Sequence, residues 1–445
     1  MSRHRWNTVQ ERMMAASMIQ YSSLIINKMI VNDCSSMSSN SSISTNDSSA
    51  SDATETSSDS SSSLSWSGDN EEDDDNLDNS SIESQDLLQL QIITRIHNQA
   101  AAYTQRIFEP IVQEIQWGRR LLVDDLSESE AILEFRFRKQ HLQAIANKLW
   151  PKLSGFIEGT QQSIKVSNGY WAPYETGLLA VLFQLARPHR LWPDMEKFFG
   201  MRKSHLSSLI STMVDALYNV SLPYLSNAAI HQQRIPYYAD RVSNKCGNLV
   251  TNVWGFIDGT LRKICRPVLL QKHMYSGHKR VHGIKFQSVV TPDGLKALLF
   301  GPINGNRHDS YMLRESGLLP QLHQLMPLNG VFYSLYGDPA YPQSAYLFGG
   351  YRNAGNGTPQ AAFNTAMSAI REPVEWSFKE IIAQFSFLDF KTSLRIFKFP
   401  VAKYYVIAAF LTNIRSFYYG NQTATYFNAQ TYTLDEYLSI TNNNA

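Results

Sequence analysis

The chain has 445 residues, of which 40 are Lys or Arg and 39 are Asp or Glu, so its formal net charge is +1. The length predicts two or three domains, because one hydrophobic core rarely exceeds ~250–300 residues. Three cysteines exclude a disulfide scaffold and a zinc finger built from cysteine pairs. No run of about 18 apolar residues occurs, which excludes a transmembrane helix.

The charge is distributed unevenly. Between Met29 and Thr94 there is no Lys or Arg but there are 14 acidic residues, so the rest of the chain holds 40 basic and only 25 acidic residues. Such a division favours a nucleic-acid or membrane partner beside an acidic tail. About two-fifths of residues 35–85 are serine, and this composition buries too little apolar surface to offset the entropy of ordering. We predict that residues 1–86 form a disordered Ser/Asp-rich tail.

Residues 87–245 are predicted to form a helical domain. Apolar residues recur with a helical period from Leu87, and residues 130–150 read as one long helix. Shorter helices follow at 176–186, 193–199 and 204–218, and together they have helix-turn-helix proportions over about 176–218. Arg202 and Lys203 would begin the recognition helix and reach DNA bases. The alternative is that these helices only pack against one another.

The pattern changes near residue 246. Alternating bulky residues predict strands at 253–258, 281–290, 295–300 and 331–336, with a turn at Thr291-Pro-Asp-Gly294 after the second. Helices are predicted again at 358–387 and 401–418. Three strands followed by strand–helix alternation predict an α/β domain over residues 246–420, with a mixed sheet flanked by helices. Residues 421–445 would form a C-terminal tail.

Three acidic residues follow or lie near these strands. Asp258 precedes Gly259, Asp338 lies between Gly337 and Pro339, and Asp309 lies in Arg307-His-Asp-Ser310. A buried carboxylate is costly unless it is paired or bound to metal. Mg²⁺ prefers oxygen ligands. Each of these acids alone would be an ordinary turn former, but together they indicate a site for a hard cation.

A fourth acid, Glu375, belongs to the helix predicted after Thr358 and Pro359, which look like an N-cap and a first-turn proline. Pro373 would kink or restart this helix, and Glu375 would lie beside the apolar face of the restarted part. Arg371 lies four residues earlier. A surface pair between Arg371 and Glu375 is the alternative to a role in chemistry.

Basic residues surround Asp258 and the strand predicted at 281–290, and they alternate with Tyr275 and Phe286. They are Arg262, Lys263, Arg266, Lys272, His273, His278, Lys279, Arg280 and Lys285. This interleaving is typical of a surface that follows a phosphate backbone. A pair of strands with solvated charged side chains is the alternative.

Five segments in this order are distinctive: Gly-Phe-Ile-Asp258-Gly-Thr260, Tyr-Ser-Gly-His-Lys-Arg-Val-His282-Gly-Ile-Lys-Phe-Gln287, Arg307-His-Asp-Ser310, Gly-Asp338-Pro-Ala-Tyr-Pro342, and Arg371 with Val374-Glu375-Trp376. Over about residues 178–418 the chain resembles the PIF/Harbinger-type DDE superfamily transposases and the nucleases derived from them. Any one segment alone would be weak, whereas the five in order make the resemblance specific.

The resemblance implies an RNase H-like catalytic core with a two-metal site. It implies that Asp258, on the first strand, Asp338, after the fourth, and Glu375, on a later helix, are catalytic and bind two divalent cations, Mg²⁺ or Mn²⁺. Asp309 would be a supporting residue. The implied activity is a metal-dependent DNA endonuclease or transposase that cleaves phosphodiester bonds at transposon ends, with strand joining left open. The alternative is a domesticated, transposase-derived DNA-binding protein that does not cleave.

The resemblance also implies partners. They are double-stranded DNA, at terminal inverted repeats and at a target site, a separate Myb/SANT-like DNA-binding protein, and a second copy of the chain in a dimer or larger assembly. The implied location is the nucleus. Residues expected to contact DNA are Arg262, Lys263, Lys279, Arg280, Arg202 and Lys203.

Overall fold

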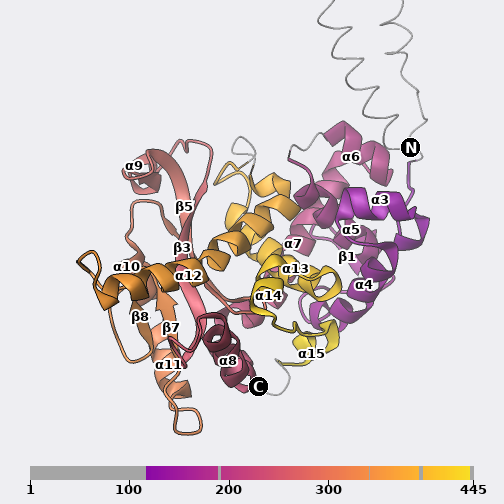
Figure 1. Cartoon of the computed structure of the whole chain (residues 1–445). Helices are drawn as coiled ribbons and strands as arrows, with labels where there is room; N and C mark the ends of the chain where they lie inside the picture. Colours follow the sequence, from indigo (N-terminus) through magenta and orange to yellow (C-terminus); the bar gives the residue numbers. More distant parts are fainter. Residues whose placement is uncertain (1–116, 189–191, 340, 390–393, 441–445) are drawn as a thin grey trace, which may run out of the picture. The chain divides into compact units, whose positions relative to one another are not determined.

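The computed structural model describes residues 117–188, 192–339, 341–389 and 394–440. They belong to one compact unit that spans residues 115–445. The predicted acidic tail and residues 87–116 of the first predicted helical stretch lie outside the described residues. The helical pattern predicted to continue through Leu121 and Leu122 is wrong at its described end, because residues 117–122 are not helical. Figure 1 shows the described part, with the strands on the left and the N-terminal helices on the right.

Helices form the first part of the described chain. They are η1 (Val123–Asp125), α3 (Glu128–Phe135), α4 (Lys139–Leu153), α5 (Tyr174–Ala186), α6 (Trp192–Phe199), α7 (Lys203–Ser226), η2 (Ala228–Arg234) and α8 (Ile235–Lys245). Between α4 and α5 lies a short hairpin of β1 (Ile164–Lys165) and β2 (Trp171–Ala172). The three helices predicted within 176–218 are confirmed, and the last extends further than predicted.

The single long helix predicted at 130–150 is wrong. It is interrupted at Arg136, whose φ of 69° lies in the left-handed region and cannot continue a helix. The Arg136 guanidinium donates to the carbonyls of Leu133, Ala186 and Gln384. Contacts with two distant helix ends therefore hold Arg136 in this conformation, which divides the segment into α3 and α4.

A mixed sheet forms the second part. Its strands are β3 (Val253–Lys263), β4 (Tyr275–Ser276), β5 (Val281–Val290), β6 (Lys296–Asn304), β7 (Ser334–Gly337) and β8 (Leu347–Gly349). Strands β6, β5 and β3 are antiparallel neighbours, and β3, β7 and β8 are parallel neighbours. This mixed α/β arrangement fits the predicted nuclease core. Strand β7 starts three residues later than predicted, because Asn329 and Gly330 turn with positive φ before it.

Helices cover both faces of the sheet. They include α10 (Asp309–Glu315), α11 (Leu318–Leu325), α12 (Pro359–Gln384), α13 (Val401–Tyr419) and α14 (Gln422–Phe427). On one face, Trp254 and Ile257 of β3 pack with apolar residues of α8, α10 and α11. On the other, Phe256 packs with apolar residues of α12 and α14. Helix α12 crosses in front of the strands in Figure 1 and contacts β3 and β5.

Helix α12 begins as predicted and then differs from the prediction. The Thr358 hydroxyl accepts from the N–H of Ala361 (3.2 Å), and Pro359 is the first helical residue. The predicted restart at Pro373 does not occur, because the helix continues to Gln384. One proline removes a single backbone hydrogen bond, whereas buried residues on both sides of Pro373 pack in one cluster with residues of the sheet. They are Met367 and Ile370 before it, and Val374 and Phe378 after it.

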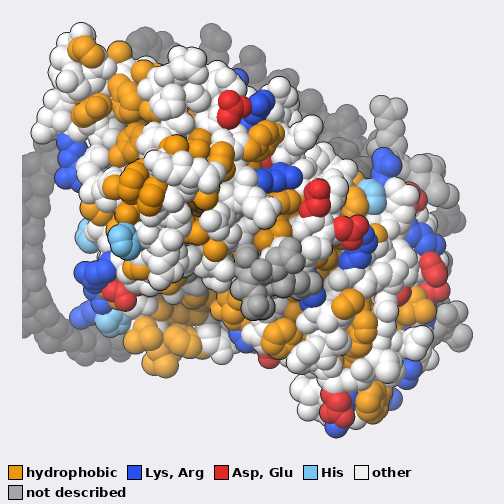
Figure 2. Space-filling model, turned by 90° about the horizontal axis from the view of Figure 1, so that it is seen from below, with side chains coloured by type: hydrophobic (Ala, Val, Ile, Leu, Met, Phe, Trp, Pro, Cys, Tyr) orange, Lys and Arg blue, Asp and Glu red, His pale blue; other side chains and the backbone are white. Residues whose placement is uncertain are grey.

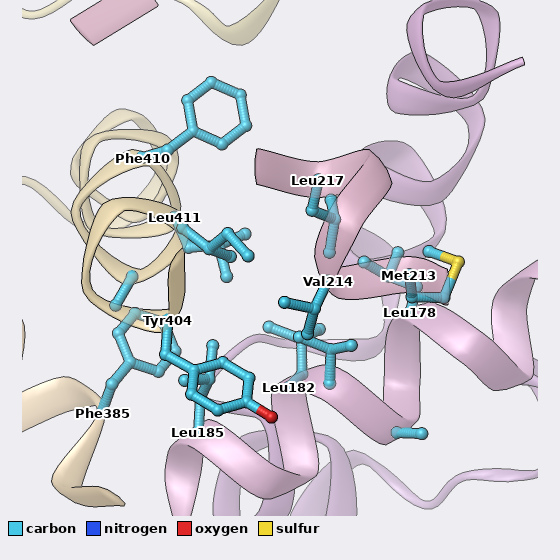
Figure 3. Packing of buried hydrophobic residues seen from close by; sticks show 14 of the residues in the cluster. Leu178, Leu182, Leu185, Met213, Val214, Leu217, Phe385, Tyr404, Phe410 and Leu411 are labelled. Carbon is cyan, nitrogen blue, oxygen red and sulfur yellow. The ribbon is translucent and has the colours of Figure 1, made fainter. Parts of the chain in front are cut away.

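The helical part and the sheet share one core. Leu182 and Leu185 of α5, Val214 and Leu217 of α7, and Leu411 of α13 pack together, as Figure 3 shows. Phe286 of β5 and Leu299 of β6 belong to the same cluster. The boundary expected between residues 245 and 246 is therefore not a boundary between two cores. No helix in the described ranges is both long and apolar enough to cross a membrane.

The described part of the segment expected as a C-terminal tail is folded. It contains α14 and α15 (Leu434–Ser439). Tyr437 is fully buried, and its hydroxyl accepts from Asn413 Nδ2 (3.2 Å). The Tyr224 hydroxyl donates to the carbonyl of Leu438 (3.0 Å). Residues 421–440 thus contribute to the hydrophobic core and do not form a separate tail.

Replacement of Leu411 by Ala should destabilise the whole unit, because Leu411 is fully buried where α5, α7 and α13 meet. The free energy of unfolding should fall by about 2–5 kcal/mol, because the removed methyl groups are no longer buried on folding and a cavity remains in their place. Urea unfolding followed by circular dichroism measures it. Leu133→Ala, at an exposed position of α3, is the control. Equal effects of the two substitutions would contradict the shared core.

Candidate active site

Two of the predicted acids are brought together by the parallel pairing of β3 and β7. Ile257 pairs with Gly337, so Asp258 and Asp338 follow at the same level on neighbouring strands. Neighbouring strands lie about 4.8 Å apart. Asp258 continues on β3, whereas Asp338 immediately follows the end of β7. Both side chains are half-buried.

Asp309 reaches the same place because Gly259 has no side chain. A Cβ at Gly259 would lie 3.0 Å from Asp309 Oδ1 and 3.0 Å from Met312 Cε. Asp309, the first residue of α10, therefore lies against the β3 backbone directly beside Asp258. The sequence Asp258-Gly259 looks like a turn signal, but here it lies inside a strand and lets a second carboxylate approach.

The fourth predicted acid, Glu375, comes from α12. It lines the same hollow as Asp258, Asp309 and Asp338, which has a volume of about 900 Å³. Its other lining residues are Gly259, Thr260, Leu261, Arg262, Ser276, His278, Lys279, Lys285, His308, Ser310, Arg352, Arg371, Phe378 and Lys379. The structure thus brings all four predicted acids together from four separate elements.

Two cationic side chains of the protein pair with these acids. Arg371 Nη1 lies 3.4 Å from Asp258 Oδ2, and Lys285 Nζ lies 3.1 Å from Asp309 Oδ1. The ion pair that the structure gives Arg371 is with Asp258 rather than with Glu375, which was the alternative considered from the sequence. Each pair joins residues distant in the chain, so spacing alone could not reveal it.

The charges in the hollow influence one another. The pKa of Asp258 is raised to about 6, mainly by burial and less by the Asp309 and Asp338 carboxylates, against the opposing effects of Arg371 and the Gly259 N–H. That N–H donates to Asp258 Oδ1 (2.8 Å). The pKa of the Tyr341 hydroxyl is raised well above its usual range by burial and by the same three aspartates. Asp309 and Asp338 therefore affect the pKa values of both Asp258 and Tyr341.

The residues fit a divalent cation in donor type. The hollow offers carboxylate oxygens, which Mg²⁺ and Mn²⁺ prefer. In the described part of the chain, however, no three Asp, Glu, His or Cys side chains are arranged so that they could hold an ion. In this arrangement, Arg371 and Lys285 supply the positive charge beside Asp258 and Asp309.

Predicted DNA-contact residues are divided between two places. Arg262 and Lys279 line the hollow, whereas Lys263 and Arg280 are exposed on the β3–β5 hairpin outside its lining. Arg202 and Lys203 are exposed at the start of α7 and are not part of that lining. On the face shown in Figure 2, Lys and Arg side chains lie in small separate groups among apolar and uncharged ones.

Sequence reasoning missed two cationic residues of the hollow. Arg352 donates through Nε and Nη2 to the carbonyl of Pro339 (2.9 and 2.7 Å), so it ties down the loop after Asp338. Lys379 lies one helical turn after Glu375 and also lines the hollow. The four-residue spacing on a helix was a usable signal for Lys379. Nothing local in the sequence indicated Arg352.

Residues 257–413 match the family model described as DDE superfamily endonuclease. The matched stretch contains Asp258, Asp309, Asp338 and Glu375, and it begins on β3 and ends in α13. No curated protein and no solved structure gave a match. The similarity supports a transposase-like nuclease, for which DNA is the substrate.

Asp258→Asn should make the folded chain more stable at neutral and alkaline pH. The pKa of Asp258 is about 6 when folded and 3.8 in a model peptide, so its protonated form favours folding. That contribution is present below the lower pKa and is lost as the pH rises through the higher one. We expect a gain on the order of 2 kcal/mol at pH 8, seen as a higher melting temperature, and a smaller gain at pH 5.

The control for this stability measurement is Asp240→Asn, at an exposed position of α8. It should leave the melting temperature nearly unchanged at both pH values. A melting temperature of Asp258→Asn that is lower than that of the original chain at pH 8 would show that the Arg371–Asp258 pair outweighs the cost of burying the charge.

Proposed function

We propose that this chain is a metal-dependent DNA endonuclease of the PIF/Harbinger transposase type that cleaves phosphodiester bonds at transposon ends. The observation that carries the proposal is the convergence of Asp258, Asp309, Asp338 and Glu375 in one hollow, within the stretch similar to DDE endonucleases. Four separate elements supply these acids. A surface of unrelated turns would have no reason to gather them.

Asp258, Asp338 and Glu375 are the residues that would hold two divalent cations, Mg²⁺ or Mn²⁺, with Asp309 beside them. Bound ions of this kind activate a water or a 3′-hydroxyl and stabilise the leaving oxygen in phosphoryl transfer. Hard oxygen donors are the main requirement for such a site. The raised pKa of Asp258 comes mainly from its burial, and the neighbouring Asp309 and Asp338 carboxylates add to it.

The cationic residues of the hollow have a different task. Asp309 holds the Lys285 ammonium at 3.1 Å, in the lining of the hollow. Lys285 can therefore contact a phosphate oxygen of DNA without a search through its rotamers. Arg371 neutralises the half-buried Asp258 carboxylate while DNA is absent, and its guanidinium can donate to a phosphate oxygen that enters the hollow.

Basic residues in the hollow and on the β3–β5 hairpin would contact the DNA along its length. Arg262 and Lys279 line the hollow, and Lys263 and Arg280 continue the positive charge along the β3–β5 hairpin. Arg202 and Lys203 start α7 after the α6–α7 turn, where a recognition helix would present its first residues. We assign phosphate contacts to the first group and base contacts to the second.

The wider setting is also part of the proposal. The substrate would be double-stranded DNA at terminal inverted repeats and at a target site, and strand joining would follow cleavage. A Myb/SANT-like DNA-binding partner, a dimer or larger assembly, and a nuclear location follow from the resemblance to Harbinger-type transposases. The four acids argue against a retired, purely DNA-binding descendant, because mutually repelling carboxylates have no use in binding DNA phosphates.

The purified chain should nick a supercoiled plasmid that carries the DNA flanking its gene, in the presence of Mg²⁺ or Mn²⁺. Glu375→Gln should lower the nicking rate by at least ~100-fold, because it removes one carboxylate from the ion site. Agarose gels of the plasmid forms measure the rate. Glu372→Gln, an exposed acid on the same helix, is the matched control. DNA binding without nicking in either metal would favour the non-cleaving alternative.

Lys279→Gln should weaken DNA binding about equally for all sequences, because a phosphate contact carries no base information. The slope of log affinity against log salt concentration should become shallower by about one per phosphate contact removed. Fluorescence anisotropy at several salt concentrations gives the slope. Lys165→Gln, at an exposed position of the β1–β2 hairpin, is the control. An equal change of slope in both variants would contradict a specific phosphate path beside the hollow.

A further inference from the structure

Strand β3 is linked to β5 by an arm, residues 264–280, that carries three exposed aliphatic side chains in a row. Val268 is 88% exposed, Leu269 is 64% exposed and Leu270 is 53% exposed. Single exposed apolar residues are normal on proteins, but a contiguous group often marks a contact site. We call Val268, Leu269 and Leu270 the apolar tip.

Hydrogen bonds fix the backbone on both sides of the apolar tip. On one side Ile264 is fully buried, and its N–H donates to the carbonyl of His282 (3.0 Å). On the other side the N–H groups of His273 and Met274 donate to the carbonyl of Leu270 (3.0 and 3.1 Å). The carbonyl of His273 in turn accepts from the N–H of Asn306 (3.2 Å). The chain therefore holds these apolar side chains in solvent on an anchored backbone.

The backbone of Leu270 is itself unfavourable. Its φ of 58° and ψ of 28° place a bulky side chain in the left-handed region, which is costly for residues other than Gly, Asn and Asp. Burial of Leu270 does not offset this cost, because the side chain is largely exposed. Strained and exposed positions of this kind are typical of contact sites that a partner completes.

The charge around the apolar tip identifies the chemistry of that partner. Residues 259–292 contain no Asp or Glu. The same stretch contains seven Lys and Arg residues: Arg262, Lys263, Arg266, Lys272, Lys279, Arg280 and Lys285. The same arm of a second copy would be repelled by this charge, whereas a polyanion would be attracted. Apolar side chains framed by cations fit DNA, which has charged phosphates outside and apolar base faces inside.

The arm is continuous with the hollow. Ser276, His278 and Lys279 of the arm line it together with the four acids. In the other direction β3 rises about 3.3 Å per residue, so Lys263 lies roughly 16 Å along the strand from Asp258. In the sequence the apolar tip follows Lys263 after the buried Ile264. A duplex that lies along β3 from the acids to Lys263 would span about five base pairs, at 3.4 Å per base pair, and the tip would meet it near that end.

We propose that Val268, Leu269 and Leu270 form a wedge that enters a base-pair step of the bound duplex while the surrounding Lys and Arg residues hold its phosphates. Inserted aliphatic side chains of this kind unstack a step and kink the helix. The proposal rests on the proposed function, because it takes the DNA held at Asp258 and Glu375 as the partner. Its consequence is a preference for DNA whose stacking is already weakened.

The test compares two fluorescein-labelled probes in EDTA with the full chain. One is a short duplex of mixed sequence, and the other is the same duplex with a small mismatched bubble, whose unstacking is already complete. The original chain should bind the bubble at least about tenfold more tightly. Replacing Val268, Leu269 and Leu270 together by Ser should remove that preference and change affinity for the intact duplex by less than about twofold, since the phosphate contacts remain.

The matched control replaces Val331 and Phe332 by Ser, because both are exposed in the turn before β7. This variant should keep the preference for the bubble. Val268→Ser alone, at the most exposed of the three positions, should reduce the preference, and equal melting temperatures confirm that both tip variants are folded. A preference absent from the original chain, or unchanged in the triple variant, overturns the wedge.

Two further outcomes are separable. If the triple variant dissociates an oligomer in sedimentation and keeps its preference for the bubble, the tip contacts a second copy and the wedge is wrong. Failure of the proposed nuclease would appear as an absence of nicking in Mg²⁺ or Mn²⁺. The binding comparison is made without metal, so it can still be interpreted when nicking is absent. Each proposal can therefore fail without the other.

Discussion

The burial of the Asp258 carboxylate beside other acids is the constraint on which this site depends. Burial raises the pKa of Asp258, and the Asp309 and Asp338 carboxylates beside it raise that pKa too. The fold must hold these acids together against the cost of a buried and crowded negative charge. It does so with rigid backbone, since Ile257 and Gly337 pair in register and Gly259 admits Asp309, and with positive charge, since Arg371 and Lys285 stand beside the acids.

The position of α12 connects this site to the rest of the molecule. Helix α12 carries Arg371 and Glu375, and its last carbonyl, of Gln384, accepts from Arg136 of the N-terminal helices. On the sheet side, Glu380 pairs with the fully buried ammonium of Lys296 (2.9 Å). A shift of α12 by one helical turn would leave that ammonium buried without a partner, which is strongly unfavourable. Contacts well outside the site therefore fix the positions of Arg371 and Glu375.

The sequence predicted what depends on local pattern. Alternation along β3 and β5 placed Asp258 on a strand, and Thr358 with Pro359 marked the start of α12. The predictions that failed depend on contacts between residues that are distant in the sequence. Arg136 breaks a well-patterned helix because carbonyls of Ala186 and Gln384 bind its side chain. Arg371 pairs with Asp258 rather than with its helical neighbour because the sheet brings that acid to it.

The core shared by α5, α7, α13, β5 and β6 has an evolutionary consequence. A part of a protein can be exchanged for another by recombination only if the cut leaves both pieces able to fold. A cut at residue 246 would separate Leu182 and Val214 from Leu411 and leave apolar faces open on both pieces. The helices before the sheet would therefore have to be exchanged together with it, since neither piece keeps a closed core alone.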